Sequence, residues 1–170
     1  GYIILGRLIE QVAGMSYEKY IEERVFQPIG IAERDLSFTI DPARLAKGYQ
    51  KKISFTNLML GFMIDKKKYL GKAEGKWKPF RFFYVNGAPY GGLIGTPNAF
   101  MKYIQALMDT EHNILSLDSK NQLFAQNHTT KGGPSGVCLS WFKGSLNGES
   151  YFTHPGGGGG YYTEIRVYPK

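Results

Sequence analysis

The sequence is poor in cysteine and has no long apolar run. Cys138 is the only cysteine among the 170 residues, so the chain forms no internal disulfide and no multi-cysteine zinc site. Polar residues and Gly61 interrupt the longest apolar run, residues 53–64, which is too short for the ~20 apolar residues of a membrane-spanning helix. With 42% apolar and 21% charged residues, the chain is typical of a globular protein. We predict one domain over residues 1–170.

Metal-binding and phosphate-binding motifs are also missing. His112, His128 and His154 lack the spacing of a metal site, so we predict no metal and no cofactor, and the polar neighbours of the first two indicate exposed side chains. The Gly156–Gly160 run lacks the Lys-Ser/Thr of a phosphate-binding loop and precedes a strand pattern. It is predicted to let two strands turn tightly, or to let another molecule approach the backbone.

Positive charge is confined to one segment. Residues 51–81 hold nine bases and two acids, which accounts for the whole net charge of +7, because the remaining bases and acids cancel. This distribution excludes a general nucleic-acid-binding surface, so we predict no nucleic-acid partner. The longer segment 51–86 adds aromatic residues without a clear period, which favours a solvated surface excursion. The alternatives are a lid and a patch that contacts a membrane surface.

Four segments have helical periodicity. The first is predicted to be a buried helix; it has no capping residue before it and ends at Gly14. Thr96 and Pro97 provide a capping hydroxyl and a first-turn proline for the third. The predicted helices cover residues 1–13, 17–27, 97–108 and 116–126.

The C-terminal third changes to a period of two. Alternation over residues 137–142, 151–154 and 161–168, with a hairpin signal at Asn147-Gly148 and the glycine run as the second connection, predicts a three-stranded antiparallel meander. Helices first and a meander last predict an α+β fold with helices packed on an antiparallel sheet. An uncapped first helix and a last strand that stops without a covering element lead us to expect a chain truncated at both ends.

Four blocks of the sequence stand in the order of one family's motifs. Residues 1–17 resemble the helix after a Tyr-x-Asn motif, and residues 25–31 a Pro-Leu-Gly-Met stretch. Gly91–Thr96 resembles a Gly-Gly-Leu-x-Ser-Thr helix start, and His154–Gly157 a Lys/His-Thr/Ser-Gly-Gly strand. The family is that of the serine beta-lactamases and penicillin-binding-protein-like hydrolases, especially the branch of class C beta-lactamases, D-alanyl-D-alanine carboxypeptidases and esterases. The resemblance implies a partial beta-lactamase/transpeptidase-like fold.

The resemblance also implies a reaction. Members of the family attack an ester, amide or lactam with a serine and pass through an acyl-serine intermediate, while a neighbouring amine or phenolate takes the serine proton. The order of the blocks places the Ser-x-x-Lys and Tyr-x-Asn motifs before Gly1, so we expect the chain alone to be inactive. The family is commonly exported or held in the cell envelope, but no residue here decides the compartment.

Site residues are carried over by position from the same resemblance. His154 is expected to give the cleft positive or hydrogen-bonding character, and Gly157 to offer its N–H as half of an oxyanion hole. Pro155, Gly156 and Gly158 are expected to contact substrate, with Gly156 letting it lie against the strand. Pro155 replaces a hydroxyl that recognises a carboxylate, which favours ester or peptide-type substrates over penicillins.

A second function stays open at this point. The same cleft in a non-catalytic relative would bind a peptide, and the basic segment 51–81 would attract an anionic or membrane partner. Pro155 and the basic segment are the features that keep this alternative.

Overall fold

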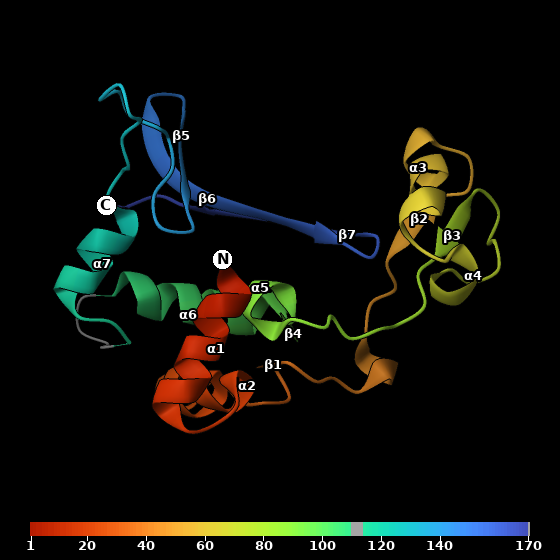
Figure 1. The fold of residues 1–170 in the computed structure, drawn as a ribbon, viewed down its shortest axis with the longest axis horizontal. Coiled ribbons are helices and arrows are strands. Elements are labelled where there is room, and N and C mark those ends of the chain that lie inside the picture. Colours follow the sequence, from red (N-terminus) through yellow and green to blue (C-terminus); the bar gives the residue numbers. More distant parts are fainter. Residues whose placement is uncertain (110–113, 170) are drawn as a thin grey trace. The chain divides into compact units, whose positions relative to one another are not determined.

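The computed structural model describes residues 1–109 and 114–169 (Figure 1). The chain forms two compact units: Gly1–Arg44 with Tyr84–Gln122, and Leu45–Phe83 with Leu123–Lys170. The single domain expected over residues 1–170 stays a prediction. The predicted exposure of His112 concerns a residue outside the described ranges.

Unit 1, the first of these, is mostly helical. Among its described residues, β1 (Leu36–Ser37) pairs with β4 (Ile94–Gly95) in antiparallel register. Its helical elements are α1 (Tyr2–Ala13), α2 (Tyr17–Ile21), the π-helical turn η1 (Glu22–Phe26), the 3-10 turns η2 (Gln27–Ile29) and η3 (Pro42–Arg44), α5 (Ala88–Gly91), α6 (Pro97–Met108) and α7 (Leu117–Phe124), which crosses into the second unit. None of the helices among the described residues has the length and apolar character needed to cross a membrane.

Local signals set the ends of these helices. Gly14 stops α1 in the left-handed conformation with φ 66°, and the Thr96 hydroxyl accepts a hydrogen bond of 3.2 Å from the Ala99 N–H at the start of α6. The predicted positions of the first, third and fourth helices are therefore confirmed. The second continues beyond Ile21 only as π and 3-10 turns, because Pro28 removes a donor from the helical ladder.

The core of unit 1 surrounds Phe26. This ring is 4% exposed and clusters with Ile31, Leu36 and Ala99, which joins the end of the second helical segment to β1 and α6. The Phe26 ring meets Tyr103 edge-on at 6.2 Å between centroids. Burial raises the pKa of the Tyr103 phenol, which therefore stays neutral.

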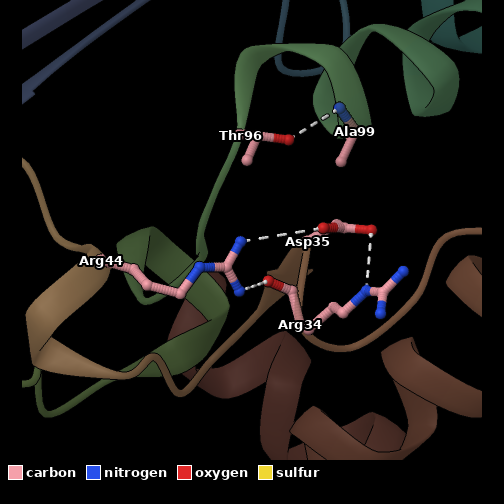
Figure 2. A network of polar contacts seen from close by, with 5 residues as sticks. All are labelled: Arg34, Asp35, Arg44, Thr96 and Ala99. Atoms are coloured by element: carbon pink, nitrogen blue, oxygen red, sulfur yellow. Dashed lines mark hydrogen bonds and ion pairs between the residues drawn. The ribbon is translucent and has the colours of Figure 1, made fainter.

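Asp35 connects β1 to the start of α6. Its backbone carbonyl accepts a hydrogen bond of 2.8 Å from the Thr96 N–H, next to the hydroxyl that caps the helix. Figure 2 shows its carboxylate between Arg34 at 3.8 Å and Arg44 at 3.9 Å, while Arg44 also donates to the Arg34 carbonyl. Because these charged groups are partly exposed, each pair contributes only about 0–1 kcal/mol, and the backbone hydrogen bond is what positions the helix.

The apolar side of α1 is exposed, contrary to the prediction of a buried helix. Ile4, Leu8 and Val12 are 74%, 58% and 81% exposed, whereas Gly6 is buried on the opposite face. A Cβ at Gly6 would overlap the Pro89 ring of α5. The described residues thus cover one face of α1 and leave the apolar stripe open.

Unit 2, the second compact unit, contains the sheet that the sequence predicts. Strands β5, β6 and β7 form an antiparallel meander in that order, and Asn147 and Gly148 make the first turn with φ 52° and 86°. A smaller antiparallel pair joins β2 to β3. The elements of this unit are β2 (Tyr49–Lys51), α3 (Phe55–Met63), α4 (Lys66–Tyr69), β3 (Trp77–Pro79), β5 (Phe142–Leu146), β6 (Glu149–Gly158) and β7 (Tyr161–Val167).

The strand predicted at 137–142 is wrong in its position. The Cys138 N–H donates to the Trp141 carbonyl at 2.7 Å, and Ser140 has φ 63°, so the chain turns there instead of extending. Cys138 and Trp141 are both buried, and the Trp141 ring lies 5.6 Å from that of Phe124. A tight turn therefore buries both residues, which an extended strand would place on opposite faces, and β5 begins only at Phe142.

Only part of the glycine run 156–160 forms the connection between β6 and β7. Gly156–Gly158 continue β6, while Gly159 and Gly160 alone make the turn, with φ 57° and 82°. A Cβ at Gly160 would overlap the Tyr49 backbone and lie 2.7 Å from the Gly48 carbonyl carbon. The predicted tight turn is confirmed, and its tip lies against the backbone that leads into β2.

This contact makes Gly160→Ala more destabilising than Gly148→Ala. Both glycines have a similar positive φ, 82° and 86°, but nothing lies within 4 Å of a Cβ at Gly148. We expect Gly148→Ala to lower the free energy of unfolding by about 1 kcal/mol, because alanine is strained at a positive φ. Gly160→Ala should lower it by about 1–3 kcal/mol more, because its Cβ also displaces neighbouring backbone. Urea unfolding of both variants measures the difference; equal losses would contradict the contact.

Candidate active site

The predicted site residues lie in one row on β6. His154–Gly158 pair with Tyr161–Ile165 of β7. They extend beyond the start of β5, where Phe142 pairs with Thr153. Among the described residues, no named strand pairs with the other edge of this row. The second half of β6 is thus a two-stranded ribbon with one open edge.

The register determines which backbone groups reach that edge. Gly158 and Tyr161 close a two-residue turn, and antiparallel ladders alternate between residues that bond across the pair and residues that do not. Counting back from Gly158, this rule directs the backbone groups of Gly157 and Pro155 away from β7. Proline is tolerated there because no ladder hydrogen bond needs its missing N–H, and the Gly157 N–H becomes an outward donor.

The side chains around this row leave it accessible. His154, Pro155, Gly157 and Gly158 are exposed, and Gly156 is half-buried. The His154 ring lies 6.1 Å from that of Phe142, at the start of β5.

Gly156 is constrained by β7. A Cβ there would come within 2.7 Å of the Thr163 hydroxyl oxygen, which itself lies 3.5 Å from the Gly156 carbonyl oxygen. The absence of a side chain at this position therefore preserves the pairing as well as the open face above the strand.

Thr153 is a polar neighbour of the site that the motif comparison misses. Its hydroxyl oxygen is buried and has no hydrogen-bond partner among the described residues. Because strand side chains alternate, it lies on the same face as Pro155. In the sequence, the two-residue spacing between Thr153 and Pro155 is the signal that identifies Thr153 as a neighbour of the site.

Two Ser-x-x-Lys patterns inside the chain have structural roles. The Ser16 hydroxyl accepts a hydrogen bond from the Lys19 N–H at 3.3 Å as the cap of α2, and the Lys19 ammonium lies 3.7 Å from Glu23. The second pattern, Ser140 and Lys143, spans the turn into β5 and lacks the helical geometry that would stack the two side chains. The Ser16 hydroxyl is thus used as a helix cap, and its lysine lies beside Glu23.

A Tyr-x-Asn pattern also occurs, at residues 84–86. Its Tyr84 hydroxyl donates to the Ile40 carbonyl at 3.4 Å. The pattern stands long after the α1 block, whereas the family order requires it before that block. It therefore does not replace the motif expected before Gly1.

Other reactive groups are poorly placed for chemistry. Cys138 is 2% exposed, its thiol donates to the Phe124 carbonyl at 3.3 Å, and burial raises its pKa, so the nucleophilic thiolate is disfavoured. His128 is exposed, as predicted. In residues 1–109 and 114–169, no group of three or more His, Cys, Asp or Glu side chains is arranged to hold a metal ion.

Comparison with known proteins identifies the family. The fold combines helices with an antiparallel meander whose glycine-rich strand has one edge without a named partner strand among the described residues. The Beta-lactamase family matches residues 1–170, and the chain belongs to it. This places the chain among the serine beta-lactamases and penicillin-binding-protein-like hydrolases.

Two solved structures of penicillin-binding proteins have a similar fold. The octameric penicillin-binding protein homologue from Pyrococcus abyssi has a TM-score of 0.69 at 22% identity, covering 99% of this chain and 34% of that one. The penicillin binding protein from Bacillus halodurans has a TM-score of 0.68 at 21% identity, covering 99% and 46%. These likenesses confirm the predicted α+β fold.

The curated relative is Penicillin-binding protein 4* of Bacillus subtilis (strain 168). It is 24% identical over 174 residues, which cover 99% of this chain and 36% of the relative. The chain therefore spans about a third of that protein's length.

Proposed function

We propose that this chain supplies the strand edge of the active site in a serine hydrolase of the class C beta-lactamase, carboxypeptidase and esterase branch. The observation that carries the proposal is the outward N–H of Gly157 on the open edge of β6, within the block that resembles the family's third motif. An N–H aimed at an open strand edge can stabilise the oxyanion that forms when a carbonyl is attacked.

The proposed reaction has two halves. A serine oxygen outside residues 1–170 bonds to the carbonyl carbon, and its proton passes to a neighbouring amine or phenolate. The carbonyl oxygen becomes an oxyanion that accepts hydrogen bonds from Gly157 and from the serine N–H. When the oxyanion collapses, the bond to the leaving group breaks, and the leaving group takes the proton. Water then cleaves the acyl-serine ester by the same route.

The neighbouring residues direct the choice of substrate. Pro155 offers neither a hydroxyl nor an N–H to a substrate carboxylate, so the proposed substrates are esters and peptide-type amides rather than penicillins. His154 supplies a hydrogen bond or positive charge beside the reacting carbonyl. Gly156 and Gly158 allow the substrate to lie along the strand. In this proposal the chain without its serine does not turn over substrate. Segment 51–86 is a surface excursion from the single domain and acts as a lid over the bound substrate.

Acyl trapping tests the proposal. The complete protein, incubated with an activated p-nitrophenyl ester and with a fluorescent penicillin, is expected to gain the mass of one acyl group, more rapidly from the ester. Peptide mapping should place that group on a serine of a Ser-x-x-Lys sequence outside residues 1–170. Acylation of Ser16 or Ser140 would contradict the motif order, and no mass gain would favour the non-catalytic binding protein.

A further inference from the structure

Helix α3 buries a polar side chain and exposes most of its apolar ones. Asn57 is its buried residue: its amide donates to the Lys52 carbonyl, and its side-chain oxygen accepts from the Gln50 amide at 3.1 Å. The Ser54 hydroxyl caps the same turn by accepting from the Asn57 N–H at 3.0 Å. The helix is therefore attached to unit 2 through hydrogen bonds.

The opposite side of α3 is apolar and uncovered by the described residues. Phe62 is 81% exposed and Phe55 is 77% exposed, far beyond the exposure of an aromatic side chain in a core. The α3 apolar face consists of Phe55, Leu58, Met59, Phe62 and Met63, with Ile53 just before it, and all six are exposed. A helix of nine residues is about 14 Å long, so these side chains form one continuous stripe.

Lysines border this stripe at both ends. Lys51 and Lys52 precede α3, and Lys66–Lys68 follow it in α4. A Cβ at Gly61 would lie 3.1 Å from the Lys66 Nζ, so this ammonium sits beside the C-terminal half of the helix. Within residues 1–109 and 114–169, none of the five lysines forms an ion pair.

The two acids of the basic segment make hydrogen bonds rather than ion pairs with these lysines. The Asp65 carboxylate caps α4 by accepting from the Lys67 N–H at 2.9 Å, and the Glu74 carboxylate accepts from the Tyr49 hydroxyl at 2.9 Å. The lysines around the α3 apolar face thus keep their charge available for an external anion.

We propose that the α3 apolar face and its bordering lysines bind the surface of an anionic phospholipid bilayer. Exposed aromatic and aliphatic side chains on one face of a short helix enter the boundary between headgroups and acyl chains, while flanking lysines meet anionic headgroups. A nucleic acid would use the charges and leave the apolar face in water. This inference is independent of the acyl-serine chemistry, because it uses no residue of β6.

Vesicle sedimentation of the complete protein tests it. The protein is expected to bind vesicles of equal parts phosphatidylcholine and phosphatidylglycerol, with little binding to phosphatidylcholine alone. The variant Lys66→Gln/Lys67→Gln/Lys68→Gln should lower the partition coefficient by about a hundredfold, since each lysine near an anionic surface contributes about fivefold. Phe62→Ser should lower it by about tenfold or more.

Matched controls keep the same chemistry at other positions. The variant Lys102→Gln/Lys131→Gln/Lys143→Gln removes the same charge from exposed lysines outside the segment, and Leu146→Ser removes an exposed apolar side chain from β5. Both should bind nearly as the parent does. Binding lost equally in controls and test variants, equal binding to neutral vesicles, or no binding at all would each overturn the proposal. Variants that change sedimentation without vesicles would instead indicate that a second copy covers the face.

Discussion

Replacing Gly157 with proline in the complete protein is expected to lower kcat by about a hundredfold to a thousandfold, the cost of losing one oxyanion donor. The substitution removes the N–H that the register directs to the open edge of β6. It removes no hydrogen bond of the β6–β7 ladder, and Pro155, two residues earlier, already occupies an equivalent position. The measurement is steady-state hydrolysis of an activated ester, with kcat and KM determined separately.

Gly157→Ala is the matched control. Its Cβ would lie 3.5 Å from the Tyr161 carbonyl oxygen and 4.0 Å from the Tyr162 ring, which are ordinary contacts, and its N–H remains. We expect a kcat within a few-fold of the parent. Similar losses in the alanine and proline variants would assign the effect to steric hindrance on the strand, and an unchanged kcat in the proline variant would contradict the oxyanion role.

Short-range chemistry explains which parts of the fold can be predicted from sequence. The cap Thr96, the stop Gly14 and the turn Asn147-Gly148 act within a few residues, so each is visible in the chain itself. The helices and the meander that they delimit occur in the structure at nearly the predicted places.

Helices whose apolar side chains are exposed cannot be placed in the fold by the same rules. In α3 the buried position is held by Asn57 and five apolar residues face outward, so the usual link between apolar periodicity and burial fails. The caps Ser54 and Asp65 are the local signals that mark α3 and α4 in this segment. The apolar stripe of α1 shows the same limit, since periodicity predicts its helix but not what covers it.

The candidate site is partly visible in sequence for a related reason. Its residues His154–Gly158 are consecutive, so one strand holds them all and a motif can reveal them. The open edge beside them depends on where β5 begins, and the turn at Ser140 sets that point. The choice of Gly157 as outward donor depends on the two-residue turn at Gly159-Gly160, which leaves three of the five glycines in the strand.

Phe26→Ala is expected to destabilise the protein by about 3–5 kcal/mol, because it empties the centre of the unit 1 core. The Phe26 ring is 4% exposed and contacts the cluster formed with Ile31, Leu36 and Ala99. Truncation therefore loses both apolar burial and packing at the place where η1, β1 and α6 meet. Urea unfolding, followed by circular dichroism, measures the change in midpoint at constant slope.

Phe62→Ala removes the same atoms from the α3 apolar face and serves as the comparison. Phe62 is 81% exposed, so its loss should change the free energy of unfolding by no more than about 0.5 kcal/mol. Equal losses for the two variants would mean that Phe62 is buried in the complete protein, which would leave no free face for a bilayer. A large loss at Phe26 with none at Phe62 supports both the core assignment and the exposed face, since it shows one phenylalanine holding the fold and the other left available for binding.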